Sequence, residues 1–301
     1  MSNIIYLVDA YAHIYRGYHA IQSLKTKDGK PSNAVFALCK FLLSIRKDFK
    51  PETGAFVFDK GAPADRLKIH PSYKANRPGM PDDMRCQIET IKELIAGFGW
   101  TIIEKDGYEA DDLIATIATS MSTRSVRILT NDKDISQVVD DRITILAVNS
   151  FTKEVEERNI ENVIKKYGVK PDQIVDYLSM IGDSSDNIPG LPGVGPKTAA
   201  KLLEEFGNIE NIYSSLDKLK TEKLRSLFAD NREILRRNVS LITLDRNIPI
   251  DGIKTASDLN LKAPNCKILE KIAAEYELRS LHSVLEELGD RAPIQESLFD
   301  F

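Results

Sequence analysis

Acidic residues gather at a few points along this 301-residue chain. Asp9 and Asp59 come directly after short apolar segments that are typical of buried strands, and Asp132 and Asp134 follow a third such segment after Asn131. A single aspartate in such a place is usually a turn former or a helix cap. Because the carboxyl ends of parallel strands open at one edge of a sheet, we expect these side chains to meet there.

A second acidic group stands at the start of a predicted helix. Residues 107–112 have the sequence Gly-Tyr-Glu-Ala-Asp-Asp, which brings Glu109, Asp111 and Asp112 together. Helix capping and the helix dipole need only one or two acids. Three clustered carboxylates repel one another, so the group is costly unless cations lie among them.

A third group, Asp183 and Asp186, follows a predicted helix, where a solvated turn also explains it. All-oxygen ligation suits Mg²⁺ or Mn²⁺. Nine acids exceed the needs of one ion but fit a two-ion site, which can activate a water and stabilise the leaving oxygen of a phosphodiester. The histidines stand in no metal or triad spacing: His13, His19, His70 and His282.

A glycine-rich segment, 188–199, has the sequence IPGLPGVGPKTA and predicts a tight hairpin that opens a helix. Backbone amides at such a helix start can bind a phosphate, and the hairpin can hold a duplex backbone without recognising its sequence. A glycine-rich turn alone is weak evidence of function, but the lysine and helix that follow strengthen it. The expected contacts are Gly190, Gly193, Val194, Gly195, Lys197 and Thr198.

The stretch 60–77 carries five basic residues and one acid, with Tyr73 beside Lys74. Basic side chains next to an aromatic ring suit a single strand, whose phosphates are neutralised while a base stacks. The alternative is a solvated surface loop. Arg16, on the helix predicted after the first strand, either faces the crevice and holds the scissile phosphate or lies on the surface.

The apolar pattern predicts an α/β fold in the first half, with βαβ units and a mostly parallel sheet. Strands are expected at Ile4–Val8, Ala55–Phe58, Thr101–Ile103, Val126–Thr130 and Ile143–Val148, and helices between them at Ala34–Arg46, Met84–Phe98 and Ala110–Met121. From Pro171 onward only short helices are predicted, followed by a looser stretch at 247–264, two last helices and an extended tail from 290.

Composition adds bounds on the protein class. There are 41 basic and 45 acidic residues, a net charge of −4 that by itself argues against a nucleic-acid partner, but the charge is unevenly distributed. No apolar run approaches a membrane span, and no secretory signal is present. Three distant cysteines support neither a disulfide framework nor a zinc site. We expect a soluble protein of the cytoplasm.

These motifs together resemble the 5′-nuclease (flap endonuclease) family, and within it the 5′→3′ exonuclease domain of bacterial DNA polymerase I. The matching segments occur in the family's order: Val8-Asp9, Phe58-Asp59, 73–77, 107–112, 132–134 and 182–199. The resemblance implies a PIN-like core over 1–170 with a helical arch near 60–84. It also implies a duplex-binding helical region over 171–289, with a helix–hairpin–helix-like element at 188–206.

The resemblance also implies roles for the residues. Two or more Mg²⁺ ions, with Mn²⁺ as a substitute, are expected, together with K⁺ at the hairpin element. Arg16 and Lys74 match positions that contact the scissile phosphate, accompanied by Tyr73 and Arg77. The first metal region matches Asp9, Asp59, Glu109, Asp111, Asp112 and Asp132, and the second matches Asp134, Asp183 and Asp186.

The segment 295–301, QESLFDF, resembles the peptide by which bacterial replication proteins bind the sliding clamp, through Gln295, Leu298 and Phe299. A plain tail or a linker remnant is the alternative. The chain is either a stand-alone nuclease, which the starting Met1 favours, or a fragment of a longer polymerase.

The expected function is metal-dependent cutting of DNA at 5′ flaps, nicks and RNA-primed ends during replication and repair, by a bacterial, nucleoid-associated monomer. A non-catalytic DNA-binding scaffold is one rival, although it would not need nine acids. An RNase of the PIN-like group is another, although the predicted duplex grip and the chain length argue against it.

Overall fold

The computed structural model describes residues 3–148 and 155–289. Its centre is a six-stranded sheet in the order β3-β2-β1-β4-β5-β6. The first five strands are parallel, and β6 runs antiparallel to β5 at the edge. The strands are β1 (Ile4–Asp9), β2 (Gly54–Phe58), β3 (Thr101–Glu104), β4 (Ser125–Leu129), β5 (Ile143–Val148) and β6 (Val155–Arg158).

The register of the central strands brings their carboxyl ends level. Val8 on β1 lies opposite Phe56 on β2 and Leu129 on β4. The residues that follow these positions therefore leave the sheet at one edge. The structure thus confirms the predicted parallel sheet and sets Asp9, Asp59 and the segment after β4 at the same end of it.

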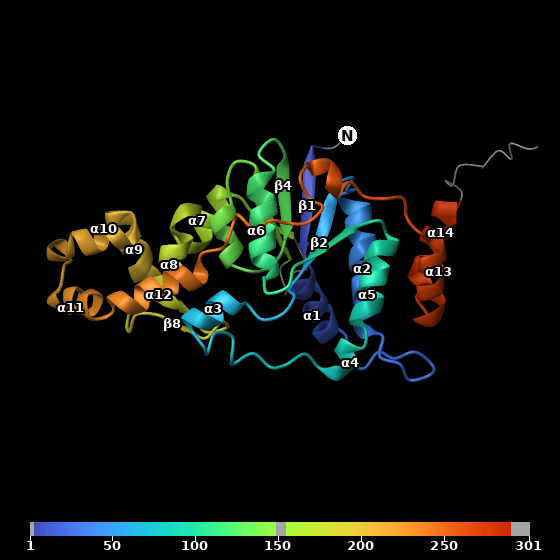
Figure 1. Cartoon of the computed structure of the whole chain (residues 1–301), viewed down its shortest axis with the longest axis horizontal. Coiled ribbons are helices and arrows are strands. Elements are labelled where there is room, and N and C mark those ends of the chain that lie inside the picture. Colours follow the sequence, from blue (N-terminus) through green and yellow to red (C-terminus); the bar gives the residue numbers. More distant parts are fainter. Residues whose placement is uncertain (1–2, 149–154, 290–301) are drawn as a thin grey trace, which may run out of the picture.

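Helices cover both faces of the sheet, and alternate residues of β1 point into two different cores. Tyr6 and Val8 pack with α1, α2 and α5, whereas Ile5 and Leu7 pack with α6. Figure 1 shows α2 and α5 on one side of the sheet and α6 on the other. These helices are α1 (Ala10–Ala20), α2 (Asn33–Asp48), α5 (Ile88–Gly97) and α6 (Ala110–Ser120). Two short helices, α3 (Ala64–Ile69) and α4 (Asp82–Arg85), bracket the expected arch segment.

A helical region extends from one end of the sheet (Figure 1). It contains α7 (Ile160–Tyr167), α8 (Ile174–Ile181), α9 (Pro196–Phe206), α10 (Ile209–Ser214), α11 (Glu222–Asp230) and α12 (Arg232–Ile242). Two short strands that the sequence did not predict, β7 (Gly182–Asp183) and β8 (Ile188–Pro189), pair between α8 and α9. This small hairpin encloses the third acidic group.

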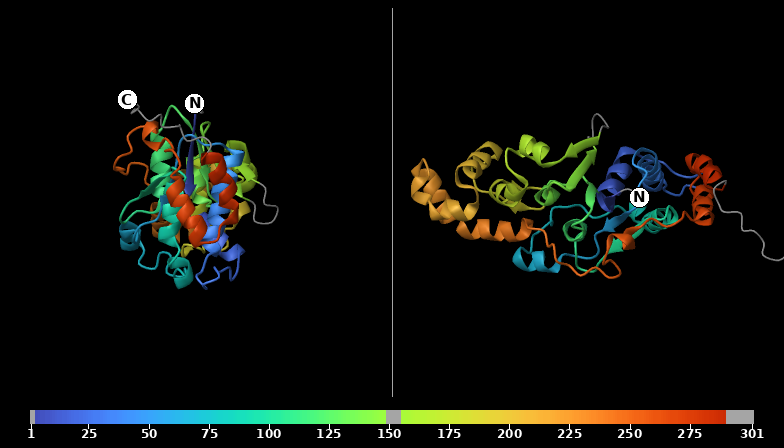
Figure 2. Two further views of the ribbon diagram at one scale, coloured as in Figure 1. Left: turned by 90° about the vertical axis from the view of Figure 1, so that its right-hand side faces the viewer. Right: turned by 90° about the horizontal axis from the view of Figure 1, so that it is seen from above.

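The position of the last two helices differs from the expectation that residues 171–289 form one helical region. Helices α13 (Cys266–Glu275) and α14 (Arg279–Gly289) lie at the opposite end of the molecule from α9–α11, as Figure 2 shows. Leu269 is fully buried and contacts the α5 glycine Gly97, so α13 packs on the sheet region. The stretch 243–265 carries the chain back there. No helix within 3–148 or 155–289 is both long and apolar enough to cross a membrane.

Candidate active site: two acidic groups joined by a basic segment

Four aspartates line one cavity of about 450 Å³ at the carboxyl ends of β1, β2 and β4. They are Asp9, Asp59, Asp111 and Asp132, which come from four separate segments of the chain. We call them the first acidic group. Lys74 and Arg77 of the arch segment line the same cavity, together with aromatic residues of α1.

Backbone and hydroxyl donors hold these carboxylates in place. Asp9 caps α1, accepting from the Ala12 amide at 3.1 Å, and it also accepts from the Thr130 hydroxyl at 2.9 Å. Asp59 accepts from the Ala110 amide at 2.7 Å and so caps α6 from the neighbouring strand. Capping thus explains part of the pattern, as the alternative interpretation predicted. It does not explain why the caps converge.

The convergence has an electrostatic cost. Burial, followed by the charge of Asp59, raises the pKa of Asp9 to about 7. Burial, followed by the charges of Asp132 and Asp9, raises the pKa of Asp111 well above its usual value. Both shifts mean that the ionised group is unstable without compensating positive charge. A divalent cation in this cavity would remove that cost.

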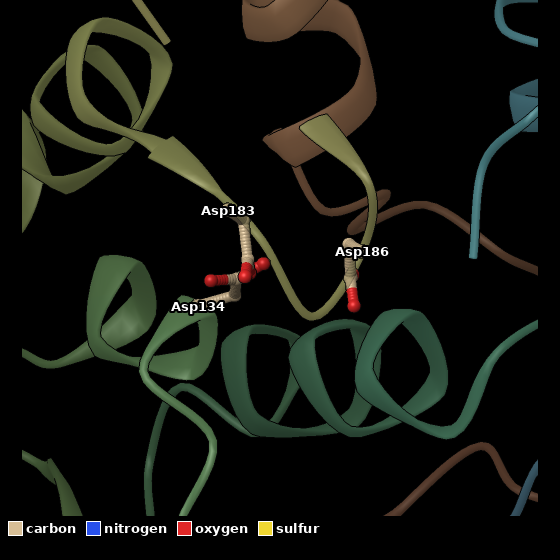
Figure 3. A group of neighbouring side chains, drawn as sticks. All are labelled: Asp134, Asp183 and Asp186. Carbon is tan, nitrogen blue, oxygen red and sulfur yellow. The ribbon is translucent and has the colours of Figure 1, made fainter. Parts of the chain in front are cut away.

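Asp134, Asp183 and Asp186 form the second acidic group, shown in Figure 3. One carboxylate oxygen from each lies within 4.8 Å of the others, a spacing that a single cation can bridge. Oδ1 of Asp134 is buried and has no hydrogen-bond partner. Burial and the charges of Asp132 and Asp183 raise the pKa of Asp134 well above its usual value. An orphaned acceptor among like charges fits a divalent cation bound by oxygen ligands.

The arch segment connects the two groups. Lys74 forms an ion pair with Glu109, and its ammonium lies 3.6 Å from Asp186. Arg77 forms an ion pair with Asp186 as well. The amide of Lys74 donates to the Asp186 carbonyl at 3.0 Å. Lys74, which is expected to contact the scissile phosphate, and Arg77, which is expected to accompany it, therefore both lie among the acids.

Tyr73 differs from the expectation that it stacks on a base. Its side chain is buried, with 6% exposure, and its hydroxyl lies 3.2 Å from both Glu109 and Asp186. A ring enclosed in this way has no free face for a base. Its role in the structure is to anchor the arch segment to Glu109 and to Asp186 of the second acidic group.

Asp112 also differs from the expected set. Both of its carboxylate oxygens accept from Arg66, and one also accepts from the Asp245 amide at 2.9 Å. It lines a smaller neighbouring cavity with Arg66 rather than the cavity of the first acidic group. Glu109 shares Arg66 as a partner at 2.5 Å. Arg66 is one of the five basic residues of the stretch 60–77, and no residue pattern signals this pairing.

Arg16 lies on α1 next to Tyr15, which lines the first cavity. Its guanidinium donates to Nδ1 of His13 at 2.8 Å and lies 5.8 Å from the centre of the Phe41 ring. No carboxylate in the described part of the chain forms an ion pair with it. His13 stands in no metal or triad spacing, but it contacts Arg16, an expected functional residue.

The hairpin residues fall into two sets. Gly190 packs against Ile181, where an added Cβ would lie 2.3 Å from backbone, and Val194 is buried, so both serve packing. The remaining four surround the start of α9 and are partly or fully exposed: Gly193, Gly195, Lys197 and Thr198. Cβ atoms added at Gly193 and Gly195 would meet open space, so a ligand can approach the backbone there. The tail residues Gln295, Leu298 and Phe299 lie outside the described residues.

Comparison with known proteins identifies the family. The N-terminal resolvase-like domain of the 5′-3′ exonucleases matches residues 4–168, and their C-terminal SAM fold matches residues 169–267. A 5′-3′ exonuclease of Aquifex aeolicus is 36% identical over 297 residues, covering 98% of this chain and 99% of that protein. DNA polymerase I of Pseudomonas aeruginosa is 40% identical over 254 residues, covering 81% of this chain, which spans 27% of that polymerase.

Solved structures share the fold. The T5 5′-exonuclease with bound zinc ions aligns with a TM-score of 0.68 at 21% identity, covering 95% of this chain and 98% of that one. The catalytic core of Rad2 in complex with a DNA substrate aligns with a TM-score of 0.62 at 19% identity, covering 95% and 92%. Together with the two family matches, they confirm the resemblance found in the motifs: the chain belongs to the 5′-3′ exonuclease family and is a nuclease, a hydrolase of phosphodiesters.

Proposed function

We propose that this protein is a Mg²⁺-dependent, structure-selective 5′ nuclease that cuts DNA at 5′ flaps, nicks and RNA-primed ends in replication and repair. One observation carries the proposal: seven aspartates form two adjoining groups at the carboxyl edge of a parallel sheet, and a basic arch segment bridges them. The relatives support it, since the T5 flap endonuclease has been solved with DNA and metal ions and the Rad2 core with its DNA substrate.

The residues that fit divalent ions are those of the two acidic groups. The first ion position would use Asp9, Asp59, Asp111 and Asp132, and the second would use Asp134, Asp183 and Asp186. Glu109, the ion-pair partner of the cavity-lining Lys74, would support the first position. Bound Mg²⁺, or Mn²⁺ in its place, supplies Lewis acidity at the scissile phosphate. Asp112 is assigned instead to holding Arg66, because both of its oxygens are occupied by that guanidinium.

The basic residues act on the phosphate itself. Lys74 has Glu109 and Asp186 as partners in the free protein, so its ammonium is already held beside the place where charge develops. When the acids bind cations, Lys74 and Arg77 become available to the phosphate oxygens. Arg16 stabilises the same charge from the α1 side. Donors fixed before the reaction stabilise a transition state without reorganisation at the moment of cutting.

The duplex is assigned to the start of α9. Open backbone at Gly193 and Gly195, with Lys197 on the first turn, suits a sugar–phosphate backbone. We also propose, from the family resemblance, that a K⁺ ion binds at the 188–206 element. The proposed domains are a nuclease core at 1–170 and a duplex-binding region from 171, although α13 and α14 pack on the core.

Cleavage of a 5′-labelled flap duplex, with Mg²⁺ and with EDTA, tests the function. We expect cutting near the flap junction only with Mg²⁺. Asp183→Asn should impair it strongly, and Asp172→Asn, at an exposed site outside both acidic groups, should not. Tight flap binding without cutting by the unaltered protein would refute the nuclease proposal and favour a DNA-binding scaffold.

The remaining assignments are a monomer in the bacterial cytoplasm, associated with the nucleoid, and tethered to the sliding clamp through Gln295, Leu298 and Phe299. An apolar pair within a mostly polar segment suits a peptide that inserts into an apolar pocket. Removing residues 295–301 should abolish clamp pull-down while leaving flap cleavage unchanged. Retained binding to the clamp would refute this part.

A further inference from the structure

His13 and Arg16 form a hydrogen bond whose donor and acceptor can be assigned. His13 is buried on the inner side of α1. Its Nε2 lies 3.1 Å from the carbonyl oxygen of Leu129, and its Nδ1 lies 2.8 Å from an Arg16 nitrogen. A carbonyl only accepts and a guanidinium only donates. The ring therefore carries its hydrogen on Nε2, is neutral, and accepts from Arg16 through Nδ1.

An aromatic ring completes the support. Phe41 of α2 stacks on the His13 ring, with centroids 4.0 Å apart and planes 19° apart. The Arg16 guanidinium lies 5.8 Å from the centre of the same Phe41 ring. An imidazole acceptor and an aromatic face thus define the position of the Arg16 side chain. Neither carries a negative charge.

The absence of charge in this support distinguishes Arg16 from the basic residues of the arch segment. Lys74, Arg66 and Arg77 each form ion pairs with carboxylates. A carboxylate partner would neutralise a guanidinium and compete with a phosphate for it. A neutral imidazole orients the guanidinium and leaves its whole charge for an anion.

The support is tied to the site through β4. Leu129 is the last residue of that strand, and the next residue, Thr130, donates to Asp9 at 2.9 Å. His13 therefore joins Arg16 to the strand end that also holds the first acidic group. A shift of this strand end would move the guanidinium and the carboxylates together.

We infer that His13 is a positioning residue: its neutral imidazole holds Arg16, with full positive charge, for a phosphate of the nucleic-acid substrate. The inference rests on the proposed function, in which Arg16 contacts that phosphate. It assigns a role to a histidine that takes no part in metal ligation or proton transfer.

Two substitutions separate positioning from simple packing. In His13→Asn, the amide oxygen replaces Nδ1 and can accept from Arg16, while the bond to Leu129 is lost. In His13→Gln, the amide nitrogen replaces Nε2 and can donate to Leu129, while the acceptor for Arg16 is lost. Both variants are measured for flap cleavage at saturating and limiting substrate and for thermal unfolding, with His282→Gln on the distant α14 as the matched control.

We expect His13→Gln to lower kcat/KM by about 10-fold or more, and His13→Asn to retain activity within about 3-fold of the unaltered protein. The order in thermal stability should not follow the order in activity. In an Arg16→Ala background, His13→Gln should change kcat/KM by less than about 2-fold, because the residue that it positions is gone. Equal loss in both backgrounds, or activity that follows stability across the variants, would overturn the inference.

The same variants distinguish this inference from the function on which it rests. If the unaltered protein cuts no flap, the nuclease proposal fails. Flap affinity in EDTA is then compared among the unaltered protein, His13→Gln, Arg16→Ala and the double variant. His13→Gln should weaken binding only when Arg16 is present. A loss of affinity that is independent of Arg16 would overturn the positioning role there too.

Discussion

Arg66 and Asp112 form a bidentate ion pair, with Nη1 to Oδ2 at 2.5 Å and Nη2 to Oδ1 at 2.8 Å. The Arg66 side chain is 11% exposed and that of Asp112 is 5% exposed. Arg66 also donates to the Leu241 carbonyl at 2.9 Å, at the end of α12. One guanidinium therefore ties the first arch helix to α6 and to the helical region.

Loss of Arg66 should destabilise the whole molecule. Arg66→Gln leaves the buried carboxylates of Glu109 and Asp112 without their shared partner, which should cost about 3 kcal/mol of unfolding free energy. Lys68→Gln, on the same helix, removes an exposed pair with Asp65 and should leave stability nearly unchanged. Urea unfolding of both variants is the measurement, and similar values for the two would contradict the structural role given to Arg66.

Two neighbouring aspartates should respond in opposite directions. Asp111→Asn removes a charge that Asp132 and Asp9 repel, so in EDTA this variant should unfold at a higher temperature than the unaltered protein. Asp112→Asn weakens the pair with Arg66 and should cost about 2 kcal/mol. With Mg²⁺, Asp111→Asn should lose more than about 100-fold in flap cleavage while still binding DNA. A fall in stability for both variants would undo this division of the acids.

Metal ions should stabilise the folded protein through both acidic groups. Saturating Mg²⁺ at about 100 times its dissociation constant should add about 2.7 kcal/mol per site, seen as a rise in melting temperature over EDTA. Asp134→Asn should reduce that rise, because Asp134 supplies an unpartnered oxygen to the second group. Asp172→Asn, an exposed acid, serves as the control. An unchanged rise in Asp134→Asn would contradict the second ion position.

The strands and the meeting of their terminal acids could be predicted because both depend on local pattern. Runs such as Ile4–Val8 are apolar throughout, as strands buried on both faces must be, and a parallel sheet then brings Asp9 and Asp59 to one edge. The outer strand β6, Val155–Arg158, was missed because it is largely exposed and has no apolar run. Edge strands of this kind depend on their partner, here β5, rather than on their own pattern.

The finer arrangement of the site differs from the sequence-based expectation where it depends on contacts between distant segments. Residue spacing places Asp111 and Asp112 in one group, but one helical step turns Asp112 toward Arg66 and leaves Asp111 facing the cavity. The burial of Tyr73 depends on Glu109 and Asp186, which are 36 and 113 residues away. His13 had a local signal, its i,i+3 spacing to Arg16 on a helix, which a search for metal and triad spacings does not detect.

Substitution at the start of α9 should weaken binding to a similar degree for every DNA sequence. Lys197→Gln should lower affinity for flaps of different sequence to a similar degree and reduce the slope of log affinity against log salt by about 1. Lys267→Gln, exposed at the start of α13 on the far end of the molecule, should leave the slope unchanged. Fluorescence anisotropy across a salt series measures both, and an unchanged slope for Lys197→Gln would remove it from the duplex grip.

Acid should destabilise the protein in part through His13. Burial, followed by the charge of Arg16, lowers the pKa of His13 to about 3 in the folded protein, whereas an unfolded histidine titrates near 6.5. Below pH 6.5 the unfolded chain therefore takes up a proton that the folded protein does not, so this contribution is complete above that pH and is lost as pH falls towards 3. Its neighbours are the Arg16 cation, the Leu129 carbonyl and the Phe41 ring, none of which titrates in this range.

Between pH 7 and pH 5 the unaltered protein should lose about 2 kcal/mol more unfolding free energy than His13→Gln, which carries no titrating ring. Urea unfolding at the two pH values measures this difference, and equal losses would show that the imidazole is not held neutral as the Arg16 contact requires.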